Sequence, residues 1–282
     1  KQWGLSGYRA RQAFSSIYQE RVSSFEAMTN LSLDLRSRLK ERFIFRPLEL
    51  ERLQESSDGT KKFLFRLEDG NLIESVLIPV KERLTACLSS QAGCSFSCGF
   101  CASGISGFKR NLETGEITGQ LLEIKRGLVP DRALTNVVFM GTGEPLDNYE
   151  NVLKAIRIIN SPRGFNIGAR RITVSTCGII PGIKRLSGEG LQIELSVSLH
   201  AADDKTRTRL MPVNKKYPLK DLISACKEYA AATKRQVTFE YVLIKGLNCS
   251  REAADNLTGL LSGWECKLNL LVYNPVQEFP YQ

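Results

Sequence analysis

The chain has 282 residues, of which 42% are apolar, 39 are Lys or Arg and 30 are Asp or Glu, and this ordinary composition excludes a disordered, collagen-like or coiled-coil protein. The length fits one large domain or a core domain with a small appendage, while no apolar run reaches the roughly 18 residues of a membrane helix and no secretory-signal pattern is seen. The formal net charge of +9 allows a phosphate-rich partner without requiring one.

The first part of the chain is predicted to be helical, because apolar side chains over residues 1–46 recur at helical spacing. Residues 61–68 and 72–80 have the character of two short strands joined by a turn at Asp69 and Gly70. We therefore expect three parts, namely an N-terminal helical accessory domain over 1–60, an extended or β linker over 61–83 and a core over 84–282.

From about Leu84 onward, short apolar strands alternate with helices. The predicted strands are Leu84–Ser89, Asn136–Met140, Arg171–Ser175, Ile193–Leu199, Val237–Ile244 and Cys266–Val272. The predicted helices cover residues 113–127, 149–159, 181–188, 218–232 and 252–263. This alternation is typical of a parallel sheet with helices outside it. Because six strands are too few for an eightfold barrel, we predict the α/β class with a partial, open parallel β/α barrel.

Each predicted strand is followed by a segment that contains Gly, Pro, Cys, His or small polar residues, which are unusual directly after an apolar strand. These segments are Gly93–Cys101, Gly141–Pro145, Ser175–Gly178, Ser198–His200, Lys245–Asn248 and Tyr273–Pro275. In a parallel α/β barrel the carboxyl ends of the strands meet at one rim, where such folds place their active sites. Because chance would scatter such segments over both rims, we interpret them as parts of one composite site.

The cysteines point to a metal centre. There are eight, too few for a disulfide scaffold, and Cys94, Cys98 and Cys101 crowd together. In a chain without a secretory signal this favours metal ligation in a reducing compartment, so we expect a cytoplasmic protein. Three thiolates on a four-iron cluster leave one iron free to bind a substrate. Two alternatives stay open, namely buried core cysteines and a zinc site completed by Cys87.

The C-x3-C-x2-C spacing of these cysteines is the signature of the radical S-adenosylmethionine (SAM) enzymes. Within them, the chain resembles the dual-specificity RNA adenine-C2 methyltransferase family from about Gly7 to its last residue. The segments that carry the resemblance are Cys87–Cys94, Gly107–Leu112, Met140–Pro145, Ser198–Ala201, Met211–Tyr217 and Tyr273–Pro275. A sister family, which methylates the same base at C8, shares most of them.

The resemblance implies a four-iron, four-sulfur cluster ([4Fe-4S]) on Cys94, Cys98 and Cys101, and SAM as the second cofactor. It implies methylation of C2 of adenosine in 23S rRNA and in tRNA next to the anticodon, through a methyl-cysteine intermediate. The SAM-binding positions that it implies are Gly143, Glu144, Ser175, Ser198, Leu199, His200 and Asn274. The Glu144 carboxylate can accept bonds from the cofactor ammonium, although a simple helix-entry turn is the alternative for this segment.

Two further residues match catalytic positions of the family. Cys87 matches a resolving cysteine that removes the methyl carrier as a disulfide, and Glu74 matches the proposed proton acceptor. The residues alone leave open that Cys87 is a buried strand thiol and Glu74 a solvated acid. The family's methyl-carrying cysteine lies well beyond the counterpart of Tyr273–Pro275, and we identify none in this chain. We therefore expect that these residues bind the cluster and SAM without completing methyl transfer.

Paired basic residues suit phosphate contacts that position RNA without reading its sequence. The pairs are Lys109-Arg110, Arg170-Arg171, Lys184-Arg185, Lys215-Lys216 and Lys234-Arg235. The N-terminal helical domain would add recognition of RNA shape. We expect 23S rRNA and tRNA as substrates, an electron donor such as flavodoxin or ferredoxin, no membrane partner and a monomer. The rival hypotheses are the C8-directed enzyme and a non-catalytic, zinc-stabilised RNA-binding module.

Overall fold

The structure is a computed structural model that describes residues 6–20, 22, 24–45, 48–129 and 132–281. It divides into two compact units, each built from three chain segments. The first unit comprises residues 1–88, 113–137 and 150–168, and the second comprises 89–112, 138–149 and 169–282. The domain boundaries predicted at residues 60 and 83 stay a prediction, since compactness alone does not delimit a functional domain.

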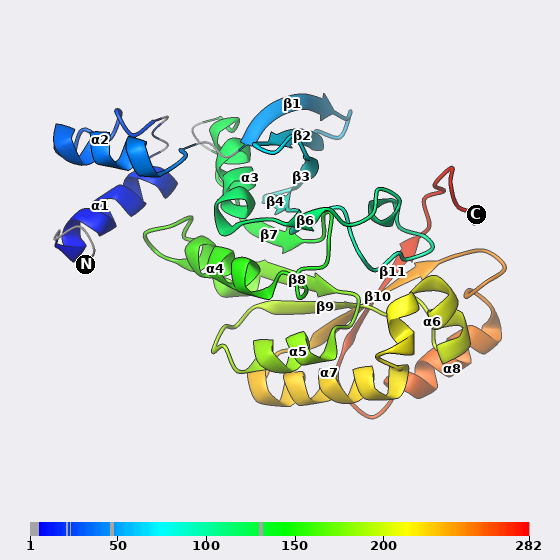
Figure 1. The fold of residues 1–282 in the computed structure, drawn as a ribbon. Coiled ribbons are helices and arrows are strands. Elements are labelled where there is room, and N and C mark those ends of the chain that lie inside the picture. Colours follow the sequence, from blue (N-terminus) through cyan, green and yellow to red (C-terminus); the bar gives the residue numbers. More distant parts are fainter. Residues whose placement is uncertain (1–5, 21, 23, 46–47, 130–131, 282) are drawn as a thin grey trace. The chain divides into compact units, whose positions relative to one another are not determined.

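The N-terminal part of the first unit is helical, as predicted. It contains α1 (Gly7–Tyr18) and α2 (Leu33–Arg42), drawn in blue in Figure 1. Ser32 begins α2, because its side chain accepts a hydrogen bond from the backbone N–H of Leu35. A small apolar cluster holds this region together, and its buried members are Phe25, Met28, Leu31 and Leu35.

Four antiparallel strands continue the first unit. They are β1 (Leu48–Glu55), β2 (Lys61–Leu67), β3 (Leu72–Val80) and β4 (Arg83–Cys87), each paired with the next. The predicted hairpin of β2 and β3 is confirmed, and its turn contains Gly70 at φ +83°. The strand β1 was not predicted, because its short alternation of Leu and Glu over residues 48–51 is interrupted at Arg52, and only its first residue is buried.

Two helices complete the first unit, α3 (Thr114–Arg126) and α4 (Tyr149–Asn160). A capping box formed by Glu113 and Glu116 fixes the start of α3. The buried face of α3 meets the sheet, where the hydroxyl of Ser75 donates to the side-chain oxygen of Gln120 at 2.6 Å. No helix in the described part of the chain combines the length and apolar character that a membrane crossing needs.

The second unit contains parallel strands. They are β8 (Ile172–Thr176), β9 (Glu194–Ser198), β10 (Val237–Leu243) and β11 (Lys267–Val272), each paired in parallel with the next. The chain enters this unit through β7 (Asn136–Phe139). With β4, all six strands predicted from the sequence are therefore present. Because β8, β9 and β10 run in one direction, their carboxyl ends share one edge of the sheet.

Helices connect these parallel strands. They are α5 (Ile180–Ser187), α6 (Asp204–Leu210), α7 (Leu219–Thr233) and α8 (Arg251–Leu261), and α5 packs beside α7 (Figure 1). The predicted helices are confirmed, whereas α6 was missed because it is short and mostly polar. Its buried residues are Arg207 and Leu210.

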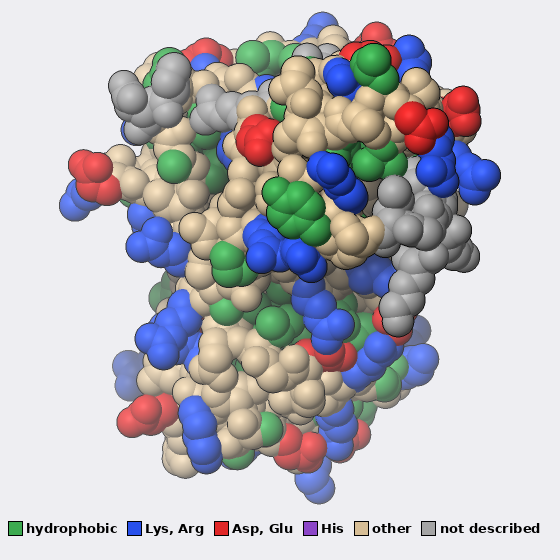
Figure 2. Space-filling view, turned by 90° about the vertical axis from the view of Figure 1, so that its left-hand side faces the viewer, with side chains coloured by type: hydrophobic (Ala, Val, Ile, Leu, Met, Phe, Trp, Pro, Cys, Tyr) green, Lys and Arg blue, Asp and Glu red, His purple; other side chains and the backbone are tan. Residues whose placement is uncertain are grey.

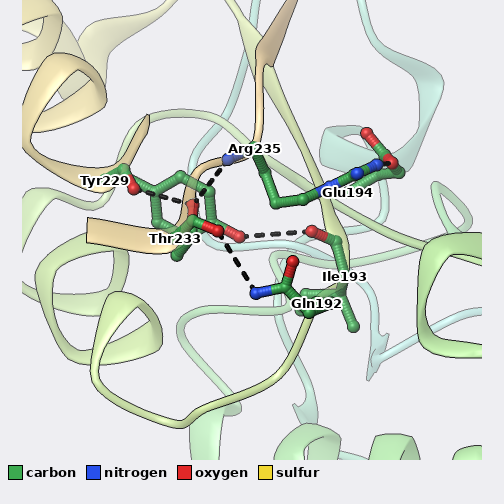
Figure 3. Close-up of polar contacts among 6 residues, drawn as sticks. All are labelled: Gln192, Ile193, Glu194, Tyr229, Thr233 and Arg235. Atoms are coloured by element: carbon green, nitrogen blue, oxygen red, sulfur yellow. Dashed lines mark hydrogen bonds and ion pairs between the residues drawn. The ribbon is translucent and has the colours of Figure 1, made fainter. Parts of the chain in front are cut away.

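The far end of α7 is anchored at the amino ends of the strands (Figure 3). The hydroxyl of Thr233 donates to the carbonyl of Tyr229 at 2.8 Å, and the phenol of Tyr229 donates to the carbonyl of Ile193. Arg235 forms an ion pair with Glu194 beside them. The amino ends of the strands are thus held by these contacts, whereas the motif segments predicted from the sequence follow the carboxyl ends at the opposite edge of the sheet.

Candidate functional site

A cavity of about 760 Å³ opens in the second unit at the carboxyl ends of the parallel strands. Apolar side chains such as Phe100, Phe139 and Met211 form part of its wall. Most of the site residues predicted from the sequence line it: Cys94, Cys98, Cys101, Gly143, Glu144, Ser175, Ser198, His200 and Asn274. Five of the six predicted strand-end segments thus contribute to one cavity, whereas the segment Lys245–Asn248 does not line it.

Leu199 is the one predicted cofactor position that does not line this cavity. Its side chain is fully buried, and its backbone N–H donates to the carbonyl of Glu240 at 3.0 Å. Leu199 therefore packs in the core beneath the sheet edge, and its contact with a cofactor stays a prediction.

The cysteine loop is shaped by glycine. Gly93 has φ +75°, and a Cβ atom there would lie 1.7 Å from the carbonyl oxygen of Gly107. Only glycine tolerates both this conformation and this close approach. Further along the loop, the backbone N–H of Cys101 donates to the carbonyl of Cys98 at 3.2 Å, and that of Gly99 donates to the carbonyl of Leu210 at 2.8 Å.

The thiols of this loop suit a soft metal centre. Burial raises the pKa of Cys94 and raises the pKa of Cys98 to about 12, and the neighbouring thiols add to both shifts. A bound metal would replace these protons, since thiolates are the ligand form. Three soft donors on the wall of one cavity fit an iron–sulfur cluster. In the described residues, no three His, Cys, Asp or Glu side chains are gathered around a single-ion position.

The loop after β7 is held by buried hydrogen bonds. Gly143 has φ +100°, and a Cβ atom there would lie 2.4 Å from the side chain of Gln91. That side chain accepts a hydrogen bond from the backbone N–H of Glu144 at 2.8 Å. The carboxylate of Glu144 in turn accepts from the backbone N–H groups of Leu146 at 3.0 Å and Cys177 at 2.7 Å. Burial raises the pKa of Glu144 despite these bonds.

Glu144 is therefore an anchor of the cavity wall. It joins the loop after β7 to the loop after β8. Its carboxylate faces the cavity as well, and each oxygen has lone pairs beyond those used by the backbone. The contact with a cofactor ammonium, expected from the sequence, stays a prediction.

His200 is held in an unusual conformation after β9. Its backbone has φ 57°, and its carbonyl accepts a hydrogen bond from the side-chain amide of Asn248 at 2.7 Å. Its Nδ1 atom accepts from the backbone N–H of Val242 at 3.0 Å, and its ring meets Phe100 edge-on at 4.7 Å. Burial, helped by the charge of Arg207, lowers the pKa of His200 to about 3. The imidazole is thus a neutral, fixed part of the wall.

Sequence reasoning missed one acidic residue of the cavity. Glu240 lies on β10, and its carboxylate accepts hydrogen bonds from the hydroxyl of Ser196 at 2.6 Å and the amide of Asn269 at 2.7 Å. The signal was present, because Glu240 stands between Phe239 and Tyr241 in a strand that is otherwise apolar. A charged residue in such a strand seldom lacks a polar partner or a function.

Glu74 and Cys87 lie in the first unit, on neighbouring strands. Cys87 of β4 pairs directly with Val76 of β3, and Glu74 is two residues before Val76. Because side chains two apart on a strand share a face, Glu74 and Cys87 point to the same side of the sheet, with Cβ atoms roughly 7–8 Å apart. Glu74 is 48% exposed and forms an ion pair with Lys62 at 3.0 Å, while Cys87 is buried.

Two family models match the chain. The model of the Radical SAM superfamily matches residues 88–255. The model of the ribosomal RNA large subunit methyltransferase N-terminal domain matches residues 1–45. The second match falls within residues 1–60, the region predicted as a helical accessory domain.

Several proteins are similar to the whole chain. The probable dual-specificity RNA methyltransferase RlmN of Thermoanaerobacter sp. (strain X514) is 47% identical over 280 residues, which cover 99% of this chain and 81% of that protein. The dual-specificity RNA methyltransferase RlmN of Syntrophus aciditrophicus is 48% identical, with 99% of this chain and 80% of that protein covered. The crystal structure of a radical SAM methyltransferase from Sphaerobacter thermophilus superposes with a TM-score of 0.94 at 45% identity, covering 99% of this chain and 82% of that one. The α/β fold with its parallel strands and N-terminal helices is thereby confirmed as a radical SAM fold.

Proposed function

The chain belongs to the radical SAM superfamily and, within it, to the dual-specificity RNA methyltransferases, and on this basis we propose that it methylates C2 of adenosine in 23S rRNA and in tRNA next to the anticodon. The observation that carries the proposal is the single cavity lined by all three motif cysteines and by six of the seven predicted SAM-binding positions. A chain that shared only the fold of the family would not be expected to place these side chains around one cavity.

The cysteine loop would hold the cluster and the strand ends would hold SAM. Cys94, Cys98 and Cys101 supply three thiolates, so that a four-iron cluster keeps one iron for the amino and carboxylate groups of SAM. Bound there, the cluster supplies the electron that makes SAM reactive. The polar groups of Ser175, Ser198 and Asn274 line the same cavity and suit the ribose and carboxylate of a nucleoside cofactor.

The neutral His200 and the apolar wall would keep this cavity dry. Phe100 packs against the imidazole, and Met211 and Tyr273 are buried behind the opening. Excluding water protects reactive intermediates and strengthens the electrostatic contacts that orient SAM. These residues would therefore act by shaping the site rather than by exchanging protons.

Glu74 and Cys87 would act on the substrate side of the reaction. In the proposal, Glu74 accepts the proton that leaves C2 after methyl addition. The Cys87 thiolate then attacks the sulfur of the methyl-carrying cysteine, for which no residue is identified among these 282. An S–S bond forms as the sulfur–carbon bond to the adduct breaks, and the electron pair of that bond passes to the carbon. Their placement on one face of β3 and β4 supports a joint role, because both must act on the same adduct.

RNA would be held mainly through its phosphates. Basic side chains are spread over the face shown in Figure 2, interspersed with acidic ones. Such a distribution suits contacts to a folded RNA more than a single phosphate pocket. The proposal further includes an electron donor such as flavodoxin or ferredoxin, a monomeric enzyme and, because ribosomes and tRNA work there, a cytoplasmic location.

The test is nucleoside analysis of RNA from cells of the source organism with and without the gene. We expect 2-methyladenosine to disappear from both 23S rRNA and tRNA when the gene is inactivated, and to return when it is restored on a plasmid. Loss of 8-methyladenosine instead would establish the C8-directed alternative. Unchanged nucleosides in both RNAs would contradict the proposal.

A further inference from the structure

Arg207 of α6 is a fully buried arginine that hydrogen-bonds only to uncharged oxygens among the described residues. The acceptors are the carbonyls of Cys177, Ser198, Leu199 and Tyr217 and the side-chain oxygen of Asn214, at 2.8–3.4 Å. Removing an ion from water is costly, and a buried arginine usually recovers the cost by pairing with a carboxylate. Here the positive charge stays uncompensated by direct contact.

The guanidinium joins the two loops that form the cavity wall. It donates to the carbonyl of Cys177 after β8 at 2.8 Å and to that of Ser198 at the end of β9 at 3.0 Å. The planar guanidinium carries N–H donors on separate nitrogens, so it can hold two loops at once. The ammonium of lysine has all its donors on one nitrogen and cannot span both carbonyls in this way. Both Cys177 and Ser198 line the cavity, so Arg207 lies directly behind its wall.

The same helix supports the cysteine loop. The backbone N–H of Gly99, next to Cys98, donates to the carbonyl of Leu210 at the end of α6 at 2.8 Å. Hydrogen bonds therefore connect α6 both to the metal-binding loop and to the two wall loops that Arg207 holds.

The nearest acidic side chain on the helix is engaged elsewhere. The carboxylate oxygen Oδ1 of Asp204 accepts from the backbone N–H of Leu219 and from the side-chain amide of Asn214, both at 2.9 Å. Asp204 is also exposed, so water screens its charge, whereas the charge of Arg207 is enclosed by protein. The charge of Arg207 is accordingly the less screened of the two.

We propose that Arg207 is a positioning residue whose buried positive charge favours electron uptake by the cluster on Cys94, Cys98 and Cys101. The inference rests on the proposed binding of that cluster. Reduction adds one electron and no proton, taking the [4Fe-4S] core from the 2+ to the 1+ state and making the site one unit more negative. A fixed cation in a low-dielectric wall stabilises the reduced state more than the oxidised state, and cluster potentials follow local charge and solvent exposure.

The test is the midpoint potential of the reconstituted cluster, measured by an anaerobic titration with dithionite and redox mediators and read by electron paramagnetic resonance. Arg207→Gln removes the charge and keeps a hydrogen-bonding side chain, while Arg207→Lys keeps the charge and loses the fork. Arg209→Gln is the matched control, because it removes the same charge from an exposed position on the same helix.

We expect a more negative midpoint for Arg207→Gln, so that at a fixed potential near the wild-type midpoint the ratio of reduced to oxidised cluster falls about tenfold, which is 59 mV for a one-electron couple. Arg207→Lys should stay close to the wild type, and Arg209→Gln should leave the midpoint unchanged. An Arg207→Gln protein with full iron content and the wild-type midpoint would overturn the inference.

A second variant covers the case in which Arg207→Gln does not retain iron. Asn214→Asp combined with Asp204→Asn moves a carboxylate from an exposed position to a position 2.8 Å from the guanidinium, and so neutralises the charge with Arg207 in place. The second change is needed because the Asn214 amide donates to the Asp204 carboxylate at 2.9 Å, and Asp204→Asn alone is the matched control. A more negative midpoint supports the inference, and an unchanged midpoint overturns it. Absence of any cluster from the wild-type chain would instead contradict the proposed function, so the two failures are distinguishable.

Discussion

The carboxylate of Glu144 accepts a hydrogen bond of 2.7 Å from the backbone N–H of Cys177, thirty-three residues further along the chain. This contact fastens the loop after β7 to the loop after β8 across the cavity wall. The same carboxylate also fixes its own loop through Leu146. A side chain that the sequence marks as a cofactor ligand is thus also a structural link between two loops.

Replacing Glu144 by Gln should therefore impair both stability and SAM binding. A Gln side chain has one acceptor oxygen, so its NH₂ group would face a backbone N–H and leave a buried donor unsatisfied. We expect the free energy of unfolding to fall by about 1–3 kcal/mol, measured by urea denaturation. Glu252→Gln, at an exposed position of α8, is the control and should cost less than about 0.5 kcal/mol. Equal stability of the two variants would show that the Glu144 carboxylate is not needed as a double acceptor.

Gly143→Ala should disrupt the same loop for a steric reason. At Gly143 a Cβ atom would lie 2.4 Å from the Gln91 side chain and φ is +100°, whereas at Gly70 φ is +83° with no atom within 4 Å. The left-handed strain costs about 1–2 kcal/mol in both variants, and overpacking adds about 1–3 kcal/mol at Gly143 alone. Urea denaturation should thus show a larger loss for Gly143→Ala than for Gly70→Ala. Matching losses would mean that the loop moves away from Gln91 at little cost.

Glu74→Gln should remove activity while leaving the fold intact. In its ion pair with Lys62 both side chains are exposed to solvent, so the pair contributes no more than about 1 kcal/mol to the free energy of unfolding. Loss of a proton acceptor costs about 10²–10⁴ in rate, so we expect little 2-methyladenosine in RNA from cells that carry this variant of the gene. Lys62→Met, which removes the same ion pair, is the control and should keep the modification. Wild-type modification by Glu74→Gln would exclude Glu74 as the proton acceptor.

His200 should contribute a pH dependence to stability. Its pKa is about 3 in the folded chain and about 6.5 when unfolded, so below about pH 6.5 the unfolded state binds the proton first. The stabilisation is complete above pH 6.5 and is lost as the pH falls towards 3, at about 1.4 kcal/mol per unit. His200→Asn can keep the bond to Val242 N–H and tolerates φ 57°.

The measurement compares urea denaturation of the wild type and His200→Asn at about pH 7.5 and about pH 5.5. Between these values the wild type should lose about 1.3 kcal/mol more than the variant, because Asn does not titrate. Parallel losses in the two proteins would mean that folding does not lower the pKa of His200.

Much of the fold follows from local patterns. Runs rich in apolar residues such as Arg171–Ser175 and Val237–Ile244 predict buried parallel strands, which the structure shows at Ile172–Thr176 and Val237–Leu243, and their spacing predicts the helices between them. The strand β1 and the helix α6 escaped prediction for the same reason. Each buries few residues, so its conformation is set by its neighbours, as in the pairing of β1 with β2.

The site residues that could be predicted from the sequence are those whose residue type is rare in the segment around them. The three cysteines stand out by spacing, and Gly143 and Glu144 by their place after a strand. Arg207 was missed because its importance depends on burial, which a single sequence does not show, whereas Glu240 carried a signal in the sequence, a charge between two aromatic residues of a strand. Leu199 was predicted from its neighbours in the motif, yet its side chain points into the core. Membership of a motif thus identifies a segment, but it does not show which of the side chains in that segment faces the cavity.

The central claim is that three thiolates hold a four-iron cluster whose remaining iron binds SAM. The most direct test is anaerobic reconstitution of the chain with iron and sulfide, followed by electron paramagnetic resonance of the reduced protein before and after adding SAM. We expect about four irons per chain and a changed spectrum with SAM, both lost in Cys98→Ala and both kept in the exposed control Cys249→Ser. A chain that binds one zinc, or a cluster whose spectrum does not respond to SAM, would contradict the account.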